Sequence, residues 1–330
     1  MKVGVLGGGA WGTVLASLAA GRGHDVALWE LDPGDAKVLA TTRASARTVP
    51  GFHLPAAVAV TGDVGAAVRG RELVVVVVPS DAVRAALVSA GTSLGAGTVV
   101  VCASKGLEPE TRLTMAGVIV QVAPAARVAL LSGPSFAQEI AAGLPAALVS
   151  ASTDARANEA VVAALGGERF RIYTSDDVTG VAIGGALKNV IAIAAGCSDG
   201  LGFGLNARAA LMTRGLAEMS RLAVKLGAHP LTLAGLAGFG DLVLTCTGEL
   251  SRNRQVGLAL ARGETVPAIL AALAHVAEGI GTSRTARALA EDLGVDLPIT
   301  RAVASVLHDG QTARDAVTAL LARDPGAERT

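Results

Sequence analysis

KVGVLGGGAWG, from Lys2 to Gly12, is the stretch of sequence that decides the fold. A short apolar run flows directly into G-x-G-x-x-G at Gly7, Gly9 and Gly12, and a helical pattern follows over residues 13–22. In such a strand–turn–helix the first glycine permits a tight turn, the second lets a pyrophosphate approach the backbone, and the third lets the helix pack against the strand. The motif alone could also be an ordinary glycine-rich turn.

The next strand pattern favours a dinucleotide site. It runs from Asp25 to Trp29 and ends in Glu30, 18 residues after Gly12, about where an acid binds a ribose hydroxyl. Because an acid there also repels a 2′-phosphate, Glu30 favours NAD, although use of NADP stays open.

Strand patterns alternate with helical patterns through the first half of the chain. The strand patterns cover residues 58–60, 73–78, 99–102, 128–131, 147–149 and 170–173, and the helical ones cover residues 80–90, 110–122, 136–142 and 154–165. The valine run at 73–78 is typical of a strand buried on both faces. We therefore predict an α/β first domain over residues 1–178, with a doubly wound, mainly parallel Rossmann-type sheet.

Polar residues follow three of these strands. They are Pro79-Ser80, Ser104-Lys105-Gly106-Leu107-Glu108 and Ser132-Gly133-Pro134-Ser135-Phe136. Each segment could be an ordinary loop or helix cap. Ligands of such sheets bind beyond the carboxyl ends of the strands, so we expect Lys105 and the Gly-Pro-Ser turn to converge.

The β pattern stops after Tyr173. Helical patterns follow over residues 179–198, 207–226, 231–236, 256–262, 267–276, 283–293, 299–307 and 312–322. We expect an all-helical second domain over residues 179–330, which carries the substrate-binding and catalytic groups.

Lys188 is the single charged residue in an apolar helical stretch, residues 178–198. Gly184 and Gly185 share its helix face, and we expect their missing side chains to leave open space beside the ammonium group. Desolvation favours the neutral amine, which makes such a lysine a candidate proton carrier. A lysine that snorkels from a buried helix is the alternative. The central lysine, the glycines and the absence of basic flanks oppose a membrane span.

Two polar clusters in the second half are candidates for chemistry. Asp241 is the sole charge of GFGDLVLTCT, residues 238–247, and a helix N-cap is its alternative role. SRNR, residues 251–254, carries two arginine guanidinium groups, a hydroxyl and an amide that could together bind a phosphate. The alternative is a solvated polar turn.

The composition excludes several classes of protein. The 330 residues carry no net charge, so no electrostatic footprint for nucleic acid or an anionic membrane is present. The three cysteines are far apart and match neither a metal site nor a disulfide framework, which suits a reducing cytoplasm.

No signal-peptide pattern opens the sequence, and residues 324–330 resemble a frayed tail. None of the five histidines lies in a comparable context, so a histidine base is not expected.

These motifs together resemble the bacterial-type NAD(P)-dependent glycerol-3-phosphate dehydrogenases over nearly the whole chain. The most specific segments are GGALKNVIAIAAGCSDGLGFGLNARAALMTRGLAEM (184–219), AGFGDLVLTCT (237–247) and SRNR (251–254), and LSGPSFAQEIAAGLP (131–145), SKGLE (104–108) and VAEG (276–279) agree with them.

The resemblance implies reversible oxidation of sn-glycerol 3-phosphate to dihydroxyacetone phosphate, with reduction supplying glycerol 3-phosphate for phospholipid synthesis. It implies Lys188 as the proton acceptor, with Asn189 as its neighbour, and a small-molecule phosphate substrate. We expect Asp241 to orient Lys188, and we expect no metal. The implied substrate contacts are Lys105, Gly133, Ser135, Lys188, Asn189, Asp241, Thr245, Ser251, Arg252 and Asn253. The implied cofactor contacts are Trp11, Lys105, Ala137, Arg252, Val276 and Glu278. The glycine fingerprint and the end of the next strand pattern add Gly7, Gly9, Ala10, Gly12, Glu30 and Leu31 to the expected cofactor contacts.

The sequence departs from the family in three places. Ala10 replaces a common serine, Leu31 stands where a basic or polar residue often meets a 2′-phosphate, and residues 42–55 keep the family pattern poorly. We expect NAD use, with dual use open, and a homodimer. The alternatives are a related two-domain β-hydroxyacid or ketoacid dehydrogenase and a non-catalytic NAD(P)-sensing module.

Overall fold

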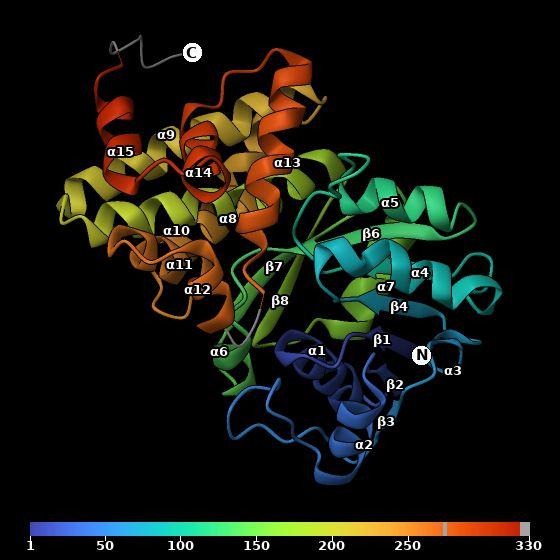
Figure 1. Cartoon of the computed structure of the whole chain (residues 1–330). Coiled ribbons are helices and arrows are strands. Elements are labelled where there is room, and N and C mark those ends of the chain that lie inside the picture. Colours follow the sequence, from blue (N-terminus) through green and yellow to red (C-terminus); the bar gives the residue numbers. More distant parts are fainter. Residues whose placement is uncertain (273–275, 324–330) are drawn as a thin grey trace. The chain divides into compact units, whose positions relative to one another are not determined.

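A computed structural model of the protein describes residues 1–272 and 276–323, and the predicted tail at 324–330 lies outside them. The chain forms two compact units (Figure 1). Unit 1 comprises Met1–Lys105 and Leu113–Val178, and unit 2 comprises Gly106–Arg112 and Thr179–Thr330. The short segment Gly106–Arg112 therefore joins the helical unit, because Leu107 is buried in the apolar core of that unit.

Unit 1 is built on one eight-stranded sheet in the order β3-β2-β1-β4-β5-β6-β7-β8. Its strands are β1 (Lys2–Leu6), β2 (Asp25–Trp29), β3 (Val58–Thr61), β4 (Leu73–Val76), β5 (Val99–Cys102), β6 (Arg127–Ser132), β7 (Ala146–Ala151) and β8 (Phe170–Ser175). Adjacent strands are parallel except β6 and β7, which are antiparallel. This is the predicted mainly parallel, doubly wound sheet. Every residue of β4 and β5 is buried, as the valine runs indicate.

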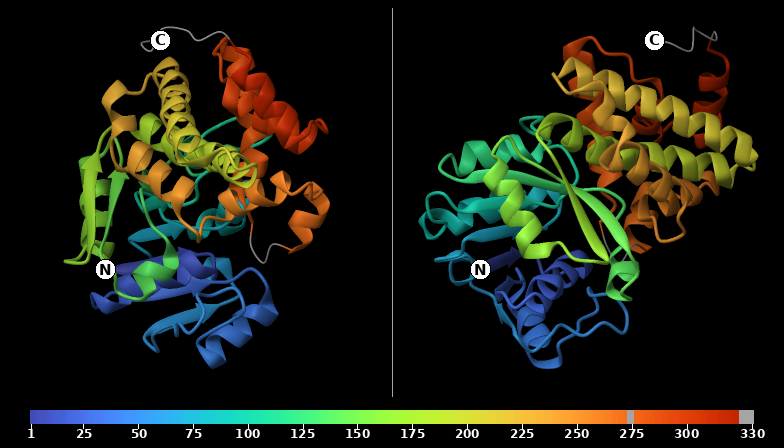
Figure 2. Two further views of the ribbon diagram at one scale, coloured as in Figure 1. Left: turned by 90° about the vertical axis from the view of Figure 1, so that its left-hand side faces the viewer. Right: turned by 180° about the vertical axis from the view of Figure 1, so that it is seen from behind.

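Helices cover both faces of this sheet (Figure 2). Helix α1 packs with α6 and α7, whereas α4 packs with both α3 and α5 on the opposite face (Figure 2). The bounds are α1 (Ala10–Gly21), α2 (Pro33–Thr42), α3 (Val64–Val68), η1 (Ser80–Ala82), α4 (Val83–Ala90), η2 (Gly91–Ser93), α5 (Met115–Val122), α6 (Ala137–Ala141) and α7 (Ala155–Leu165).

Helix ends differ from the sequence prediction where caps decide them. Helix α1 begins three residues before the predicted start at Thr13, so the last glycine of the fingerprint lies in its first turn. Helix α5 begins at Met115 instead of Glu110, because Thr114 caps it by accepting from the amide of Gly117. Two helices, α2 and α3, were not predicted, although Asp32 and Asp63 cap them in the same way.

Unit 2 is helical within the described residues. Its elements are α8 (Val178–Gly200), α9 (Gly204–Lys225), η3 (Pro230–Ala234), η4 (Leu236–Gly240), α10 (Asp241–Thr247), α11 (Arg252–Ala261), α12 (Val266–Ala272), α13 (Glu278–Leu293), α14 (Pro298–His308) and α15 (Ala313–Leu321). The sequence did not predict η4, a π-helical turn, or α10, and the predicted helix 267–276 runs partly through residues that are not described. Helix α8 is long and apolar enough to cross a membrane, but 83% of its apolar window is buried in the protein, as in the core helix of a globular unit.

The glycines of α8 admit neighbouring backbone instead of leaving open space. A Cβ on Gly184 would lie 2.7 Å from the carbonyl oxygen of Ala237, and one on Gly196 would collide with the carbonyl oxygen of Arg254. A Cβ on Gly200 would lie 2.5 Å from that of Ala261. Gly184, Gly196 and Gly200 lie on the same i, i+4 ridge of α8 as Lys188 and Ala192, and η4 and α11 cross α8 closely at these glycines. The expected space beside Lys188 is thus filled at Gly184.

Candidate active site

The glycine-rich turn after β1 has the geometry of a dinucleotide cradle. Gly7 has a φ of 128°, and a Cβ there would lie 2.9 Å from the carbonyl oxygen of Val77. A Cβ on Gly12 would collide with the carbonyl oxygen of Gly7, whereas one on Gly9 would meet nothing within 4 Å. The turn is therefore tight at its first and third glycines and open at the second, which fits an approaching pyrophosphate.

Three of the other predicted cofactor contacts of unit 1, Ala10, Leu31 and Ala137, come shortly after the end of a strand in the sequence. Ala10 is the first residue of α1, and Ala137 is the first residue of α6. Leu31 lies two residues after β2 and is 69% exposed. The ring of Trp11 packs at a tilt against that of Phe170, with 6.3 Å between the centroids.

Glu30 is buried instead of being presented to solvent. Its side chain is 3% exposed, and Oε1 accepts hydrogen bonds from Arg47 Nη1 at 3.0 Å and from the Asp32 amide at 3.3 Å. Its second oxygen lies so close to Gly8 that a Cβ there would collide with it. Sequence reasoning did not single out Arg47, because no local pattern marks an ion pair across 17 residues.

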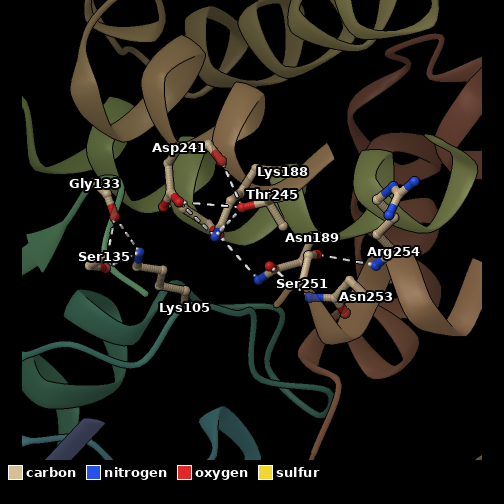
Figure 3. Close-up of polar contacts among 11 residues, drawn as sticks. Lys105, Gly133, Ser135, Lys188, Asn189, Asp241, Thr245, Ser251, Asn253 and Arg254 are labelled. Carbon is tan, nitrogen blue, oxygen red and sulfur yellow. Dashed lines mark hydrogen bonds and ion pairs between the residues drawn. The ribbon is translucent and has the colours of Figure 1, made fainter. Parts of the chain in front are cut away.

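Lys105, Gly133 and Ser135 come together at the ends of β5 and β6, as the strand-end argument predicts (Figure 3). Lys105 Nζ donates to the carbonyl oxygen of Gly133 at 2.9 Å and lies 3.4 Å from Ser135 Oγ. Ser135 Oγ donates to the same carbonyl at 2.9 Å. One ammonium group and one hydroxyl are therefore held on a shared acceptor, an arrangement that can bind an anionic or hydroxylated ligand.

Lys188, Asp241 and Thr245 form a buried hydrogen-bonded cluster in unit 2 (Figure 3). Lys188 Nζ donates to Asp241 Oδ1 and to Thr245 Oγ1, each at 2.8 Å, and its side chain is 9% exposed. Thr245 Oγ1 donates in turn to the backbone carbonyl of Asp241 at 2.6 Å. Because the threonine hydrogen is used there, its oxygen is oriented to accept from the lysine. A buried amine held by a carboxylate is a group that can carry a proton.

Close backbone approach places Asp241 in this cluster. Asp241 is the first residue of α10, one turn before Thr245, and Gly240 occupies the N-cap position. Its carboxylate accepts from Lys188 Nζ, and Asp241 is not the N-cap residue, so the structure does not support the N-cap alternative. A Cβ on Gly184 or Gly238 would press on η4 or η3, so these glycines let the segment before Asp241 approach α8.

Asn189, Asn253 and Gly279 link three helices next to this cluster. Asn253 Nδ2 donates to Asn189 Oδ1 at 2.9 Å, and the Gly279 amide donates to Asn253 Oδ1 at 3.0 Å. Ser251 caps α11 by accepting from the Arg254 amide at 3.2 Å. SRNR is therefore a helix start with buried Ser251 and Asn253, and not the solvated turn that was its alternative.

The two arginines of SRNR have different surroundings. Arg254 donates to Asp199 Oδ2 through Nε at 2.9 Å and Nη2 at 2.7 Å, and Arg208 Nη1 reaches the same oxygen at 3.0 Å. Arg252 is exposed and takes part in no hydrogen bond among the described residues. Partial desolvation by its neighbours lowers the pKa of Arg252, and the Glu278 carboxylate opposes this shift. Arg252 is thus the arginine of this segment that can bind a ligand. Val276, another predicted cofactor contact, is 52% exposed.

Two family models match the chain. They describe the N-terminus and the C-terminus of NAD-dependent glycerol-3-phosphate dehydrogenase and match residues 2–158 and 177–318. A glycerol-3-phosphate dehydrogenase (NAD(P)+) of Anaeromyxobacter sp. (strain K) is 51% identical over 331 residues, covering 99% of this chain and 100% of that protein. The chain belongs to the NAD-dependent glycerol-3-phosphate dehydrogenase family.

Further members of the glycerol-3-phosphate dehydrogenase family agree in length and fold. A protein of that name (NAD(P)+) from Geobacter metallireducens is 50% identical and covers 99% of each chain. The crystal structure of the glycerol-3-phosphate dehydrogenase of Coxiella burnetii superposes with a TM-score of 0.94 at 38% identity, covering 98% of this chain and 99% of that one.

Proposed function

We propose that the protein interconverts sn-glycerol 3-phosphate and dihydroxyacetone phosphate with NAD or NADP, and that reduction supplies glycerol 3-phosphate for phospholipid synthesis. The observation that carries this proposal is the buried cluster of Lys188, Asp241 and Thr245 in a member of the glycerol-3-phosphate dehydrogenase family. The open glycine turn at Gly9 supports the use of a dinucleotide.

Oxidation of a secondary alcohol removes a hydride from carbon and a proton from oxygen. A bound nicotinamide supplies or accepts the hydride. The chain must therefore supply the group that moves the proton, within hydrogen-bond reach of the substrate oxygen. Lys188 is that group: its ammonium donates the proton when the ketone is reduced, and its neutral amine takes the proton when the alcohol is oxidised.

Asp241 and Thr245 orient the lysine for this step. The Asp241 carboxylate at 2.8 Å stabilises the ammonium form that ketone reduction needs. Thr245 fixes the direction of Nζ through a second hydrogen bond of 2.8 Å. Together they hold a flexible side chain in one conformation, which lowers the entropic barrier to proton transfer.

Arg252 is the proposed phosphate ligand, with Ser251 and Asn253 beside it. An arginine fork binds phosphate through two parallel hydrogen bonds, and Arg252 is exposed and uses none of its donors among the described residues. We propose that Lys105, Gly133, Ser135 and Asn189 contact the substrate as well. Arg252, Val276 and Glu278 are the proposed cofactor contacts of unit 2.

Replacement of Lys188 tests the proton-transfer role. Lys188→Ala should abolish reduction of dihydroxyacetone phosphate, followed by NAD(P)H absorbance, and leave NADH binding by fluorescence unchanged. Lys225→Ala is the matched control, because Lys225 is an exposed lysine in the last turn of α9. Substantial turnover by Lys188→Ala would end the proposed role.

Replacement of the two neighbouring arginines tests the phosphate site. Arg252→Lys should raise the KM for dihydroxyacetone phosphate by about tenfold or more, because lysine cannot reproduce a bidentate contact. Arg254→Lys should instead lower thermal stability and leave this KM nearly unchanged, because Arg254 is bound to Asp199. An unchanged KM in Arg252→Lys would contradict the assignment.

The same absorbance assay separates the alternatives. Turnover of a 2-ketoacid but not of dihydroxyacetone phosphate would indicate a ketoacid dehydrogenase, and coenzyme binding without any turnover would indicate a sensing module.

We also propose a cytoplasmic homodimer. The three buried free cysteines support a reducing compartment, and exposed Leu205 and Leu231 offer apolar surface for a second copy. Light scattering of the purified protein tests the dimer.

A further inference from the structure

The ion pair between Arg47 and Glu30 changes which residue meets the adenosine ribose. Glu30 directly follows β2, at a position where an acid ordinarily binds the ribose hydroxyls of NAD and repels the 2′-phosphate of NADP. Here its carboxylate is 3% exposed, is bonded by Arg47 and by the Asp32 amide, and lies against the backbone of Gly8. Because the Glu30 carboxylate is buried and already accepts these hydrogen bonds, it is poorly placed to accept further ones from the ribose hydroxyls.

Arg47 covers Glu30 and is itself half exposed. Its side chain is 46% exposed, and the one nitrogen Nη1 reaches both Glu30 at 3.0 Å and Asp35 at 3.4 Å. A guanidinium carries five donors in a rigid fork. Among the described residues, Nη2 and Nε of Arg47 have no partner. One edge of the fork thus holds two carboxylates, and the other edge can bind an anion.

The loop that carries Arg47 is held in a defined conformation. Arg43 donates from Nε to the Leu54 carbonyl at 3.1 Å and from Nη2 to the Val58 carbonyl at 2.8 Å, which closes the loop. Val49 and Leu54 anchor it in the apolar core of unit 1. The position of Arg47 over Glu30 is therefore built into the fold, although the sequence of residues 42–55 follows no pattern that predicts it.

We propose that Arg47, and not Glu30, determines whether the protein accepts the 2′-phosphate of NADP. The proposal rests on the proposed use of NAD or NADP and adds the residue that sets the choice. Arg47 balances the charge of Glu30 and presents its open donors to the phosphate, while exposed Leu31 contributes no charge. Without Arg47, two carboxylates, Glu30 and Asp35, remain and repel the phosphate.

Direct binding measurements test this inference without relying on turnover. Fluorescence titration gives the Kd values of NADH and NADPH, and calorimetry compares 2′,5′-ADP with 5′-AMP. Arg47→Gln should weaken NADPH and 2′,5′-ADP by about 10- to 100-fold, the effect of losing a charge-assisted contact, and change NADH and 5′-AMP by less than about threefold. Arg69→Gln, an exposed arginine of the same unit, is the matched control and should change neither.

Two more variants separate a charge effect from damage to the loop. Arg47→Lys keeps the charge and should retain part of the NADPH affinity. Glu30→Gln removes the competing carboxylate and should tighten NADPH by several-fold with little change for NADH. Equal weakening of both coenzymes in Arg47→Gln, no effect of that variant, or a specific loss of NADH in Glu30→Gln would each overturn the inference. Absence of turnover with either coenzyme would instead reject the proposed function, while the titrations still test Arg47.

Discussion

Gly184→Ala should weaken catalysis from a position that provides no reactive group. The added Cβ would lie 2.7 Å from the carbonyl oxygen of Ala237, whereas ordinary contact begins at 3.4 Å, so η4 must move by about 0.7 Å. If α10 follows, the distance from Lys188 Nζ to Asp241 Oδ1 grows from 2.8 Å to about 3.5 Å. A hydrogen bond of that length contributes little.

Two opposing terms set the stability of this variant. Replacing glycine by alanine inside a helix stabilises it by about 1 kcal/mol, whereas overpacking a tight contact costs about 1–3 kcal/mol. We expect a net loss of at most about 2 kcal/mol in the free energy of unfolding. The effect on kcat should be larger, about 10- to 100-fold, because catalysis depends on sub-ångström placement of the proton carrier.

Urea unfolding and steady-state reduction of dihydroxyacetone phosphate measure the two effects separately. Gly281→Ala is the matched control, because Gly281 is also helical but a Cβ there meets nothing within 4 Å. That variant should be as active as the wild type and more stable by up to about 1 kcal/mol. A Gly184→Ala protein with wild-type kcat and unchanged or higher stability would refute the reasoning that this glycine places Asp241.

Three further predictions concern carboxylates and thiols of unit 2. Burial raises the pKa of Glu218 to about 7, although its carboxylate accepts from the amides of Ile299 and Thr300. The folded state keeps this proton to higher pH than the unfolded chain, so the stability it contributes is complete below about pH 4.5 and is lost as the pH rises through 7. The stability of the wild type relative to Glu218→Gln should therefore fall by about 1–3 kcal/mol between pH 5 and 8 in urea unfolding, and a constant difference would contradict this. Burial also raises the pKa of Cys197 and Cys246 to about 12, so a thiol reagent at pH 8 should label them only after unfolding, and rapid labelling of the native protein would show that they are accessible. Asp199→Asn should lower the free energy of unfolding by about 1–3 kcal/mol, because this carboxylate ties α8 to Arg208 and Arg254, and an unchanged urea midpoint would show that the clamp contributes nothing.

The strands of unit 1 are the part of the fold that local sequence predicts best. Residues 25–29 and 99–102 are strands with the predicted bounds, because short apolar runs of this length pack well in a buried parallel sheet. Helix ends were harder to predict, since one capping side chain such as Thr114 shifts them by several residues. The turn η4 and helix α10 escaped prediction because glycines that disfavour a helix locally are used there for close contact with α8 and η3.

The residues of the candidate site also fall into two groups, those recognisable from the sequence and those whose role depends on tertiary contacts. Lys188, Asp241, Lys105 and the Gly133–Ser135 turn were recognisable because each is a polar group in an apolar stretch or at a strand end. Two ion pairs near these residues were not recognisable, because Arg254 binds Asp199 and Arg47 binds Glu30 across 55 and 17 positions of sequence. Of two similar arginines in SRNR, tertiary contacts leave only Arg252 open to a ligand.

The sequence by itself determined the order of strands and helices, the glycine cradle and the residue types that the chemistry needs, because hydrophobic periodicity and glycine spacing act over a few neighbouring residues. Only the tertiary structure decided which of those residues pair, which glycines admit a neighbouring backbone and where the Glu30 carboxylate points. These depend on contacts between distant segments, whose energies no local pattern of side chains encodes.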